Sequence, residues 1–451
     1  MKQNRSLAIS VVIQEQQKTN LLNLLESVFP KELLERKKPD KSRDRVFTPI
    51  NTLLTMVLTA TQSDKSLKNS VALYYGLHQR IREKIYEDTL TKIKEQEVEE
   101  RMRPKVGRPR KKQILLPKSK EKDISLNTAA YSKARSRLPL EMTSELFKAS
   151  SMKDIKNTYS HWHDRKVLIV DGTYLQMQDT KELRKQYKVK RKKGDGPGYP
   201  QGLLLALIER GTGQLRDYKL SNRRKSELAL FYDMLDTIEQ GSLVLGDDLY
   251  NCYEIIAKCV RKNIDIVVPA KRKRNYRVIK KISNDDEIIE IKKPIIRSSW
   301  LEEEDEIQEK LTLRKIKSIS PEGKEYLLYT TILDESIKSD EFKILFFTRW
   351  DVEIGIREIK TIMDVNILRS KTPEMVLKEL NVSLATYNLI RQIIYEGIKE
   401  MPFSPKEDFI QKFYHLNKNV FIDKKGRVYS RWSPGRRGAK GITSQRDASI
   451  S

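Results

Sequence analysis

Three acidic residues in distant parts of the chain have the side-chain type and the setting for metal-assisted chemistry on phosphate esters. Asp171 follows the aliphatic run 167–170, and Asp247 follows the run 243–246, so both carboxylates are expected where a strand ends. Glu353 comes much later, in a segment with helical patterning. Strand ends fix the backbone, and carboxylate oxygens are ligands that suit magnesium. We therefore expect the three side chains to converge on a pair of divalent ions.

The segment around Glu353 places cations beside this acid. Arg349, Glu353 and Lys360 are spaced four and seven residues apart, which puts them on one face of a helix. A carboxylate for metal beside two cations for phosphate suits in-line displacement at phosphorus. The alternative is a solvated amphipathic helix with ordinary ion pairs, which spacing alone favours because such pairs are common.

The residues next to the two aspartates leave further alternatives open. Gly172 follows Asp171 and would let a substrate backbone approach closely. Asp248 follows Asp247 and competes with it as a metal ligand. Because side chains alternate across a strand, Asp247 and Asp248 should point to opposite faces, and spacing does not choose between them.

The charge of the chain indicates a polyanionic partner. Its 451 residues carry 88 Lys and Arg against 62 Asp and Glu, a formal net charge of +26, which favours nucleic acid over a basic surface that only aids solubility. Two cysteines, Cys252 and Cys259, exclude a disulfide framework and a four-cysteine zinc site and suit a reducing cytoplasm. Since no apolar run is long enough to span a bilayer, we expect a cytoplasmic protein without membrane contact.

Hydrophobic periodicity and turn signals divide the chain into several parts. Strand and helix signals alternate in the middle of the chain, which predicts a mixed α/β core, and Arg210-Gly211-Thr212-Gly213 predicts a hairpin within it. The expected divisions are a helical DNA-binding domain at 1–150 with a basic arm at 101–120, a core at 160–269 and 343–400, a β-rich insertion at 270–342, and a basic region at 401–451.

Three further features are candidates for DNA contact. The basic arm contains Gly107-Arg108-Pro109-Arg110, which resembles an AT-hook core whose arginines enter a narrow minor groove, although a solvated linker fits equally well. Trp300 in the insertion offers a platform for an unstacked base or, more commonly, packing in a small core. A basic, glycine-rich loop at 181–200 is expected to contact phosphate, among others through Lys190, Arg191 and Lys192.

Four motifs follow one another in the chain: Asp171-Gly172-Thr173, Gly198-Tyr199-Pro200, Leu245-Gly246-Asp247-Asp248-Leu249-Tyr250, and Arg349-x3-Glu353-x6-Lys360. Together they resemble the insertion-sequence-four family of DDE transposases, and the resemblance covers nearly the whole chain. It implies an RNase H-like mixed-sheet catalytic core, with a β-rich insertion before the helix that carries the glutamate, a helical N-terminal domain and C-terminal helices. It assigns Asp171, Asp247 and Glu353 as the catalytic, metal-binding triad, and it places Arg349 and Lys360 in the family's phosphate-binding signature.

The resemblance also implies an activity, a cofactor and partners. The activity is cut-and-paste transposition by a homodimer on double-stranded DNA, with two Mg²⁺ ions that Mn²⁺ can replace. Water nicks one strand at the terminal inverted repeat, the freed 3′ hydroxyl attacks the opposite strand to give a hairpin, a second water opens it, and the 3′ end attacks target DNA. The resemblance further implies a bacterial protein associated with the nucleoid when bound to DNA.

Two other functions remain compatible with the sequence. A metal-dependent nuclease without strand transfer could use Glu358 with Lys360, although Glu358 lies far from Asp247 along the chain. An inactive DNA-binding derivative of a transposase is the other. It is favoured by Phe346, which stands where the family signature has a tyrosine, so that the phenolic hydroxyl is missing.

Overall fold

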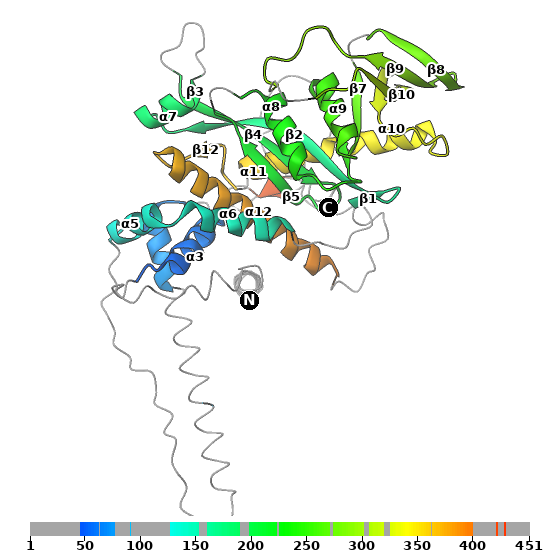
Figure 1. Cartoon of the computed structure of the whole chain (residues 1–451). Coiled ribbons are helices and arrows are strands. Elements are labelled where there is room, and N and C mark those ends of the chain that lie inside the picture. The colour runs from blue at the N-terminus through cyan, green and yellow to red at the C-terminus, as the bar shows by residue number, and fades with distance from the viewer. Residues whose placement is uncertain are drawn as a thin grey trace, which may run out of the picture. The chain divides into compact units, whose positions relative to one another are not determined.

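The structure is a computed structural model that describes residues 46–62, 64–76, 91, 127–152, 160–189, 198–222, 225–270, 274–301, 306–319, 325–361, 363–399, 421–422 and 428–429 (Figure 1). Contacts divide the chain into two units, Met1–Ile393 and Ile394–Ser451. In the second unit, the described strands β13 (Phe421–Ile422) and β14 (Val428–Tyr429) pair antiparallel. Within these described ranges, no helix is both long and apolar enough to cross a lipid bilayer.

A mixed sheet forms the centre of the first unit, and β2 (Arg165–Met177) lies in its middle (Figure 1). On one side β2 pairs antiparallel with β4 (Pro200–Glu209), which pairs antiparallel with β5 (Leu215–Leu220). On the other side β2 runs parallel to β6 (Leu243–Leu245), which runs parallel to β7 (Asp265–Ala270). An antiparallel meander followed by parallel strands beside its first member is the RNase H-like arrangement, so the predicted mixed α/β fold is confirmed.

The predicted hairpin forms between β4 and β5. Gly211 and Gly213 in its turn have φ angles of 83° and 67°, which glycine adopts without a steric penalty. Three short strands complete this part of the sheet: β1 (His161–Trp162) and β12 (Ile367–Leu368) pair with β2, and β3 (Lys188–Val189) pairs with β4.

The β-rich insertion extends the same sheet. Its strands β8 (Tyr276–Ser283), β9 (Asp286–Lys292), β10 (Lys310–Ile319) and β11 (Glu325–Thr330) form an antiparallel series, and β11 pairs antiparallel with β7. The sheet therefore continues from the core into the insertion through backbone hydrogen bonds.

The alternation of side chains along β2 builds a core on each face of the sheet. Val167 and Ile169 belong to one buried cluster, whereas Leu168 and Val170 belong to the other, which explains the unbroken aliphatic run. The second cluster is covered by α8 (Glu227–Met234) and α9 (Tyr253–Arg261), with the 3₁₀ turns η2 (Leu235–Thr237) and η3 (Asp248–Tyr250) beside them. The first cluster contains residues of α3 (Pro49–Ala60), α5 (Ala129–Arg137), α6 (Leu140–Met152), α10 (Ser339–Phe347), α11 (Trp350–Thr361) and α12 (Pro373–Lys399).

The segment after β2 departs from the expected basic loop at 181–200. Its first residues form the short helix α7 (Lys181–Gln186), which Thr180 caps by accepting a hydrogen bond from the Leu183 N–H, and β3 follows directly. Leu183 is fully buried, and Arg184 donates to Asp179. A local cap and one buried leucine thus order a segment whose composition alone predicted a loop.

Burial of Tyr187, at the end of α7, predicts a pH dependence of stability. The side chain is 2% exposed, and burial raises its pKa from 10.0 to about 12. Since the folded state favours the neutral phenol, this contribution to stability is complete below pH 10 and is lost as the pH rises through about 12. We expect the free energy of unfolding, measured by denaturant titration at each pH, to fall between pH 10 and 12 less steeply in Tyr187→Phe. Identical slopes in the two proteins would contradict this.

Candidate active site

Asp171 lies on β2, and Asp247 lies two residues beyond the end of β6, the parallel strand next to β2. The last register pair joins Ile169 of β2 to Leu245 of β6, so each aspartate lies two residues beyond this pair along its own segment. The sequence led us to expect Asp171 at the end of its strand. This expectation was wrong, because β2 continues to Met177. β6 ends at Leu245, opposite Ile169, two residues before Asp171, while β4 continues to pair with β2 at Asp171.

Each aspartate has a local hydrogen-bond partner on the backbone. The Gly172 N–H donates to Asp171 Oδ1 at 2.8 Å. Asp247 is the N-cap of η3, and its Oδ1 accepts from the Leu249 N–H at 2.8 Å. These contacts restrict the rotation of both side chains.

Helix α11 brings Glu353 and two cations to the same region. Arg349 directly precedes this helix, its side chain is 12% exposed, and its Nη2 lies 3.6 Å from Glu353 Oε1. Lys360 Nζ donates to Thr173 Oγ1 of β2 at 3.1 Å. Gly355 allows this approach, because a Cβ there would lie 2.7 Å from the Ile208 side chain on β4. The helix therefore presents two cations and one acid toward the strand that carries Asp171.

The electrostatics of Asp171 link the three acids. Its pKa is raised, first by burial and then by the charges of Asp247 and Glu353, while the Gly172 N–H and the Arg349 charge act in the opposite direction. The charges of Asp247 and Glu353, both remote from Asp171 in the sequence, therefore act on the Asp171 carboxylate. A divalent cation is the partner that would relieve this repulsion, so the chemistry of the donor set fits such an ion.

The side chains as they stand do not enclose an ion. Among the described residues, no group of three or more His, Cys, Asp or Glu side chains is arranged to hold a metal. The tight convergence that we expected of Asp171, Asp247 and Glu353 is therefore not formed in this conformation, in which each acid is engaged with a neighbour.

A fourth acid, Glu227, lies against Gly172, the residue after Asp171. The sequence analysis did not identify it as a site residue. A Cβ on Gly172 would meet its carboxylate at 2.5–2.9 Å, so this glycine makes room for Glu227, whereas we expected it to admit a substrate backbone. The pKa of Glu227 is raised, first by burial and then by Asp171 and Asp247, against the hydrogen bond from Tyr250. In the sequence, Glu227 stands out only because it directly follows Ser226, the N-cap of α8. That position does not indicate how close Glu227 lies to Asp171.

The structure also bears on the alternatives at neighbouring positions. Asp248 acts electrostatically on Arg274, whereas Asp247 acts on Asp171, which supports Asp247 as the partner acid. Glu358 pairs with Arg391 of α12 and accepts from the Tyr387 hydroxyl at 3.4 Å, so it joins two helices instead of extending the acid site with Lys360.

The two aromatic residues considered in the sequence, Phe346 and Trp300, each lie beside another aromatic ring. Phe346 lies 6.2 Å from Tyr326 between ring centroids, with the Arg349 guanidinium 5.9 Å from the Phe346 ring. Trp300 is half-buried and packs against Tyr232 of α8 at 5.2 Å. The remaining candidates for DNA contact fall outside the described residues: Arg108, Arg110, Lys190, Arg191 and Lys192.

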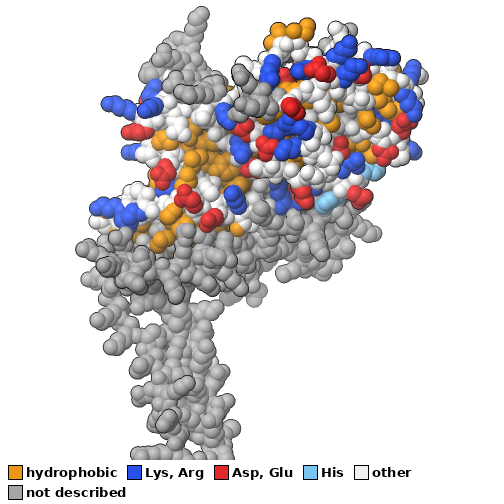
Figure 2. Space-filling model, viewed as in Figure 1, with side chains coloured by type: hydrophobic (Ala, Val, Ile, Leu, Met, Phe, Trp, Pro, Cys, Tyr) orange, Lys and Arg blue, Asp and Glu red, His pale blue; other side chains and the backbone are white. Residues whose placement is uncertain are grey.

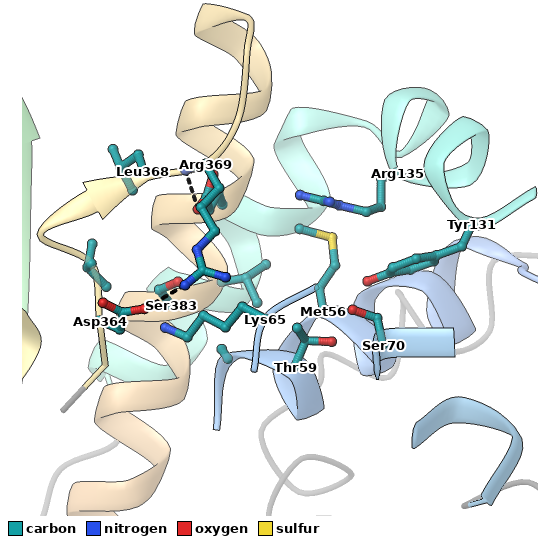
Figure 3. A pocket seen from close by; sticks show the side chains of 14 residues that line it. Met56, Thr59, Lys65, Ser70, Tyr131, Arg135, Asp364, Leu368, Arg369 and Ser383 are labelled. Atoms are coloured by element: carbon teal, nitrogen blue, oxygen red, sulfur yellow. Dashed lines mark hydrogen bonds and ion pairs between the residues drawn. The ribbon is translucent and has the colours of Figure 1, made fainter. Parts of the chain in front are cut away.

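A small pocket of about 60 Å³ is separate from the acids. It is lined by Lys65, by Arg135 of α5, and by the ion pair of Arg369 with Asp364, whose side chains point toward one another in Figure 3. None of the four acids described above lines it. The pocket lies where the N-terminal helices meet α12 and the segment after α11, so it marks a packing junction.

Comparisons with known proteins assign the family. The protein-family model described as "Transposase DDE domain" matches residues 162–389 of this chain. The chain is 26% identical over 278 residues to "Transposase InsG for insertion sequence element IS4" of Escherichia coli (strain K12), covering 60% of this chain and 61% of that one. It is 28% identical over 138 residues to "Putative transposase InsZ" of the same strain, covering 29% and 45%.

The chain thus spans less than two thirds of the length of either relative. A solved structure, the "piggyBac transposase synaptic complex with hairpin DNA", matches with a TM-score of 0.42 and 10% identity over 88% of this chain and 77% of that one. The family match contains Asp171, Asp247 and Glu353 and covers β2 through most of α12. The chain belongs to the transposase DDE-domain family, and the predicted relationship to IS4-type DDE transposases is confirmed.

Proposed function

We propose that this chain is a DNA transposase that cuts an insertion sequence at its terminal inverted repeats and joins the ends to target DNA. The observation that carries the proposal is that Asp171 on β2, Asp247 just beyond the neighbouring strand β6 and Glu353 on α11 lie inside the matched domain, with the charges of Asp247 and Glu353 acting on Asp171. The partner is double-stranded DNA, bound by a homodimer. The net charge of +26 suits this polyanion, and Lys and Arg side chains lie over the described surface between acidic ones (Figure 2).

Domains of this family use divalent metal, and we assign magnesium, with manganese as a substitute, to Asp171, Asp247 and Glu353. Bound there, the ions would supply charge stabilisation to the attacking and leaving oxygens of a displacement at phosphorus. Arg349 and Lys360 would orient the scissile phosphate, since both cations lie at the acid site. Thr173 keeps Lys360 against β2 through its hydroxyl.

Each step of cut-and-paste transposition is the same displacement with a different nucleophile, so one site can serve all of them. We include hairpin formation in the proposal, with Trp300 as the candidate to support an unstacked base and Phe346 in place of a phosphate-binding tyrosine. The basic residues Arg108, Arg110, Lys190, Arg191 and Lys192 would contact the DNA backbone.

A plasmid integration assay tests this function. The full chain is incubated with Mg²⁺, a supercoiled target plasmid and linear DNA that ends in the inverted repeats flanking its gene. We expect joined products and, from denaturing gels, a hairpin intermediate. Cleavage without joining would identify a nuclease. Retarded DNA without cleavage would identify an inactive DNA-binding derivative.

A further inference from the structure

Glu227 comes close to the proposed catalytic centre from the face of the sheet opposite to α11. It is the first residue of α8, whose buried side chains belong to the cluster that includes Leu168 and Val170. Its Oε1 lies 2.5 Å and its Oε2 lies 2.9 Å from the position that a Cβ on Gly172 would occupy. The carboxylate is therefore in contact with the β2 backbone at the residue next to Asp171.

A hydrogen bond fixes this carboxylate to the element that carries Asp247. The Tyr250 hydroxyl donates to Glu227 Oε1 at 2.7 Å, and Tyr250 is the last residue of the 3₁₀ turn that Asp247 caps. The Tyr250 ring lies under Gly246, where a Cβ would meet it at 2.8 Å. Both glycines, one beside each aspartate, thus make space for the Glu227–Tyr250 pair.

Among the described residues, Glu227 forms no ion pair that would explain its charge. A glutamine would accept the same hydrogen bond from Tyr250 and would avoid placing a third negative charge near Asp171 and Asp247, whose repulsion Glu227 experiences. An acid in the first turn of α8 gains only a modest stabilisation from the helix dipole. A carboxylate at this position becomes favourable when a cation is bound beside it.

We propose that Glu227 is a fourth carboxylate of the catalytic centre, whose negative charge strengthens binding of the divalent cation from the α8 side of the sheet. The inference rests on the proposed function, because it concerns the same metal site. It goes beyond the three-acid assignment, since it gives Gly172, Gly246 and Tyr250 a common role in seating this side chain.

Calorimetric titration of Mn²⁺ into the full chain tests the proposal. We expect Glu227→Gln to weaken Mn²⁺ binding about tenfold while the melting temperature of the metal-free protein stays equal or rises, because a repelling charge is removed. Glu227→Asp keeps the charge and should recover most of the affinity. Asp233→Asn, which removes an acid paired with Lys225 further along α8, is the matched control and should bind Mn²⁺ like the wild type.

Two results overturn the inference. One is Mn²⁺ binding by Glu227→Gln equal to that of the wild type; the other is weaker binding together with a lower melting temperature of the metal-free variant, which would show a structural role. Gly172→Ala gives a second route, since its Cβ displaces the Glu227 carboxylate without removing any charge, and it should also weaken Mn²⁺ binding. Asp171→Asn distinguishes this inference from the function itself: if that variant binds Mn²⁺ and nicks DNA normally, the proposed function fails, whatever Glu227 does.

Discussion

Asp171→Asn is expected to reduce magnesium-dependent nicking of end DNA by on the order of 10³-fold while leaving the protein at least as stable as before. The amide keeps the shape of the side chain, and β2 is held by β4 on one side and by β6 on the other, so the backbone should not move. What is lost is the negative charge at the point where the three acids influence one another.

The effect on stability follows from the sign of the pKa shift. Burial raises the pKa of Asp171, so the folded state disfavours its ionised form, and at neutral pH the charge costs stability. An amide removes this cost, and the melting temperature of the metal-free protein should therefore not fall. Loss of nicking together with an unchanged or higher melting temperature would separate a catalytic role from a structural one.

Asp179→Asn is the matched control for Asp171→Asn. Asp179 lies just beyond the end of β2 and pairs with Arg184, so the same change of charge is made on the same stretch of chain but outside the acid site. This variant should nick end DNA like the wild type. If Asp171→Asn does the same, the assignment of the acids is wrong.

Asp286→Ala is expected to lower the free energy of unfolding by about 3–5 kcal/mol. Asp286 of β9 accepts two hydrogen bonds from Arg314 of β10, at 2.9 Å and 2.6 Å, and the two side chains are 3% and 1% exposed. Arg314 also donates to the backbone oxygens of Asp334 and Ile337, which lead into α10. Removal of the carboxylate leaves a guanidinium without its counter-charge in the interior.

Urea denaturation measures the loss of unfolding free energy expected for Asp286→Ala. The control is a variant of an exposed ion pair on the same two strands. Lys310 and Glu290 also join β10 to β9, at 3.2 Å, but the lysine side chain is 55% exposed. Glu290→Ala should therefore cost roughly 1 kcal/mol or less. Replacing both buried partners, as Asp286→Leu with Arg314→Met, should recover part of the loss, because no unpaired charge remains. Equal costs for Asp286→Ala and Glu290→Ala would refute the argument from burial.

Local patterns in the sequence predicted the individual elements well. The apolar runs predicted β2 and β6, and the glycines at 211 and 213 predicted the hairpin. These features depend on residues a few positions apart, so they are present in the sequence itself. The prediction of a loop was wrong for residues 181–189, because one helix cap and one buried leucine outweighed the basic composition of this segment.

The sequence by itself determined that this chain carries acids after two aliphatic runs and a third in a later helical segment with two cations, since residue types and spacings are enough for that. Only the tertiary structure decided which acids influence one another: Asp247 acts on Asp171, Glu358 belongs to a helix pair, and Glu227 occupies the space that Gly172 leaves. The physical reason is that pleating, register and helix packing set distances between residues far apart in the chain, and repulsion and burial depend on those distances.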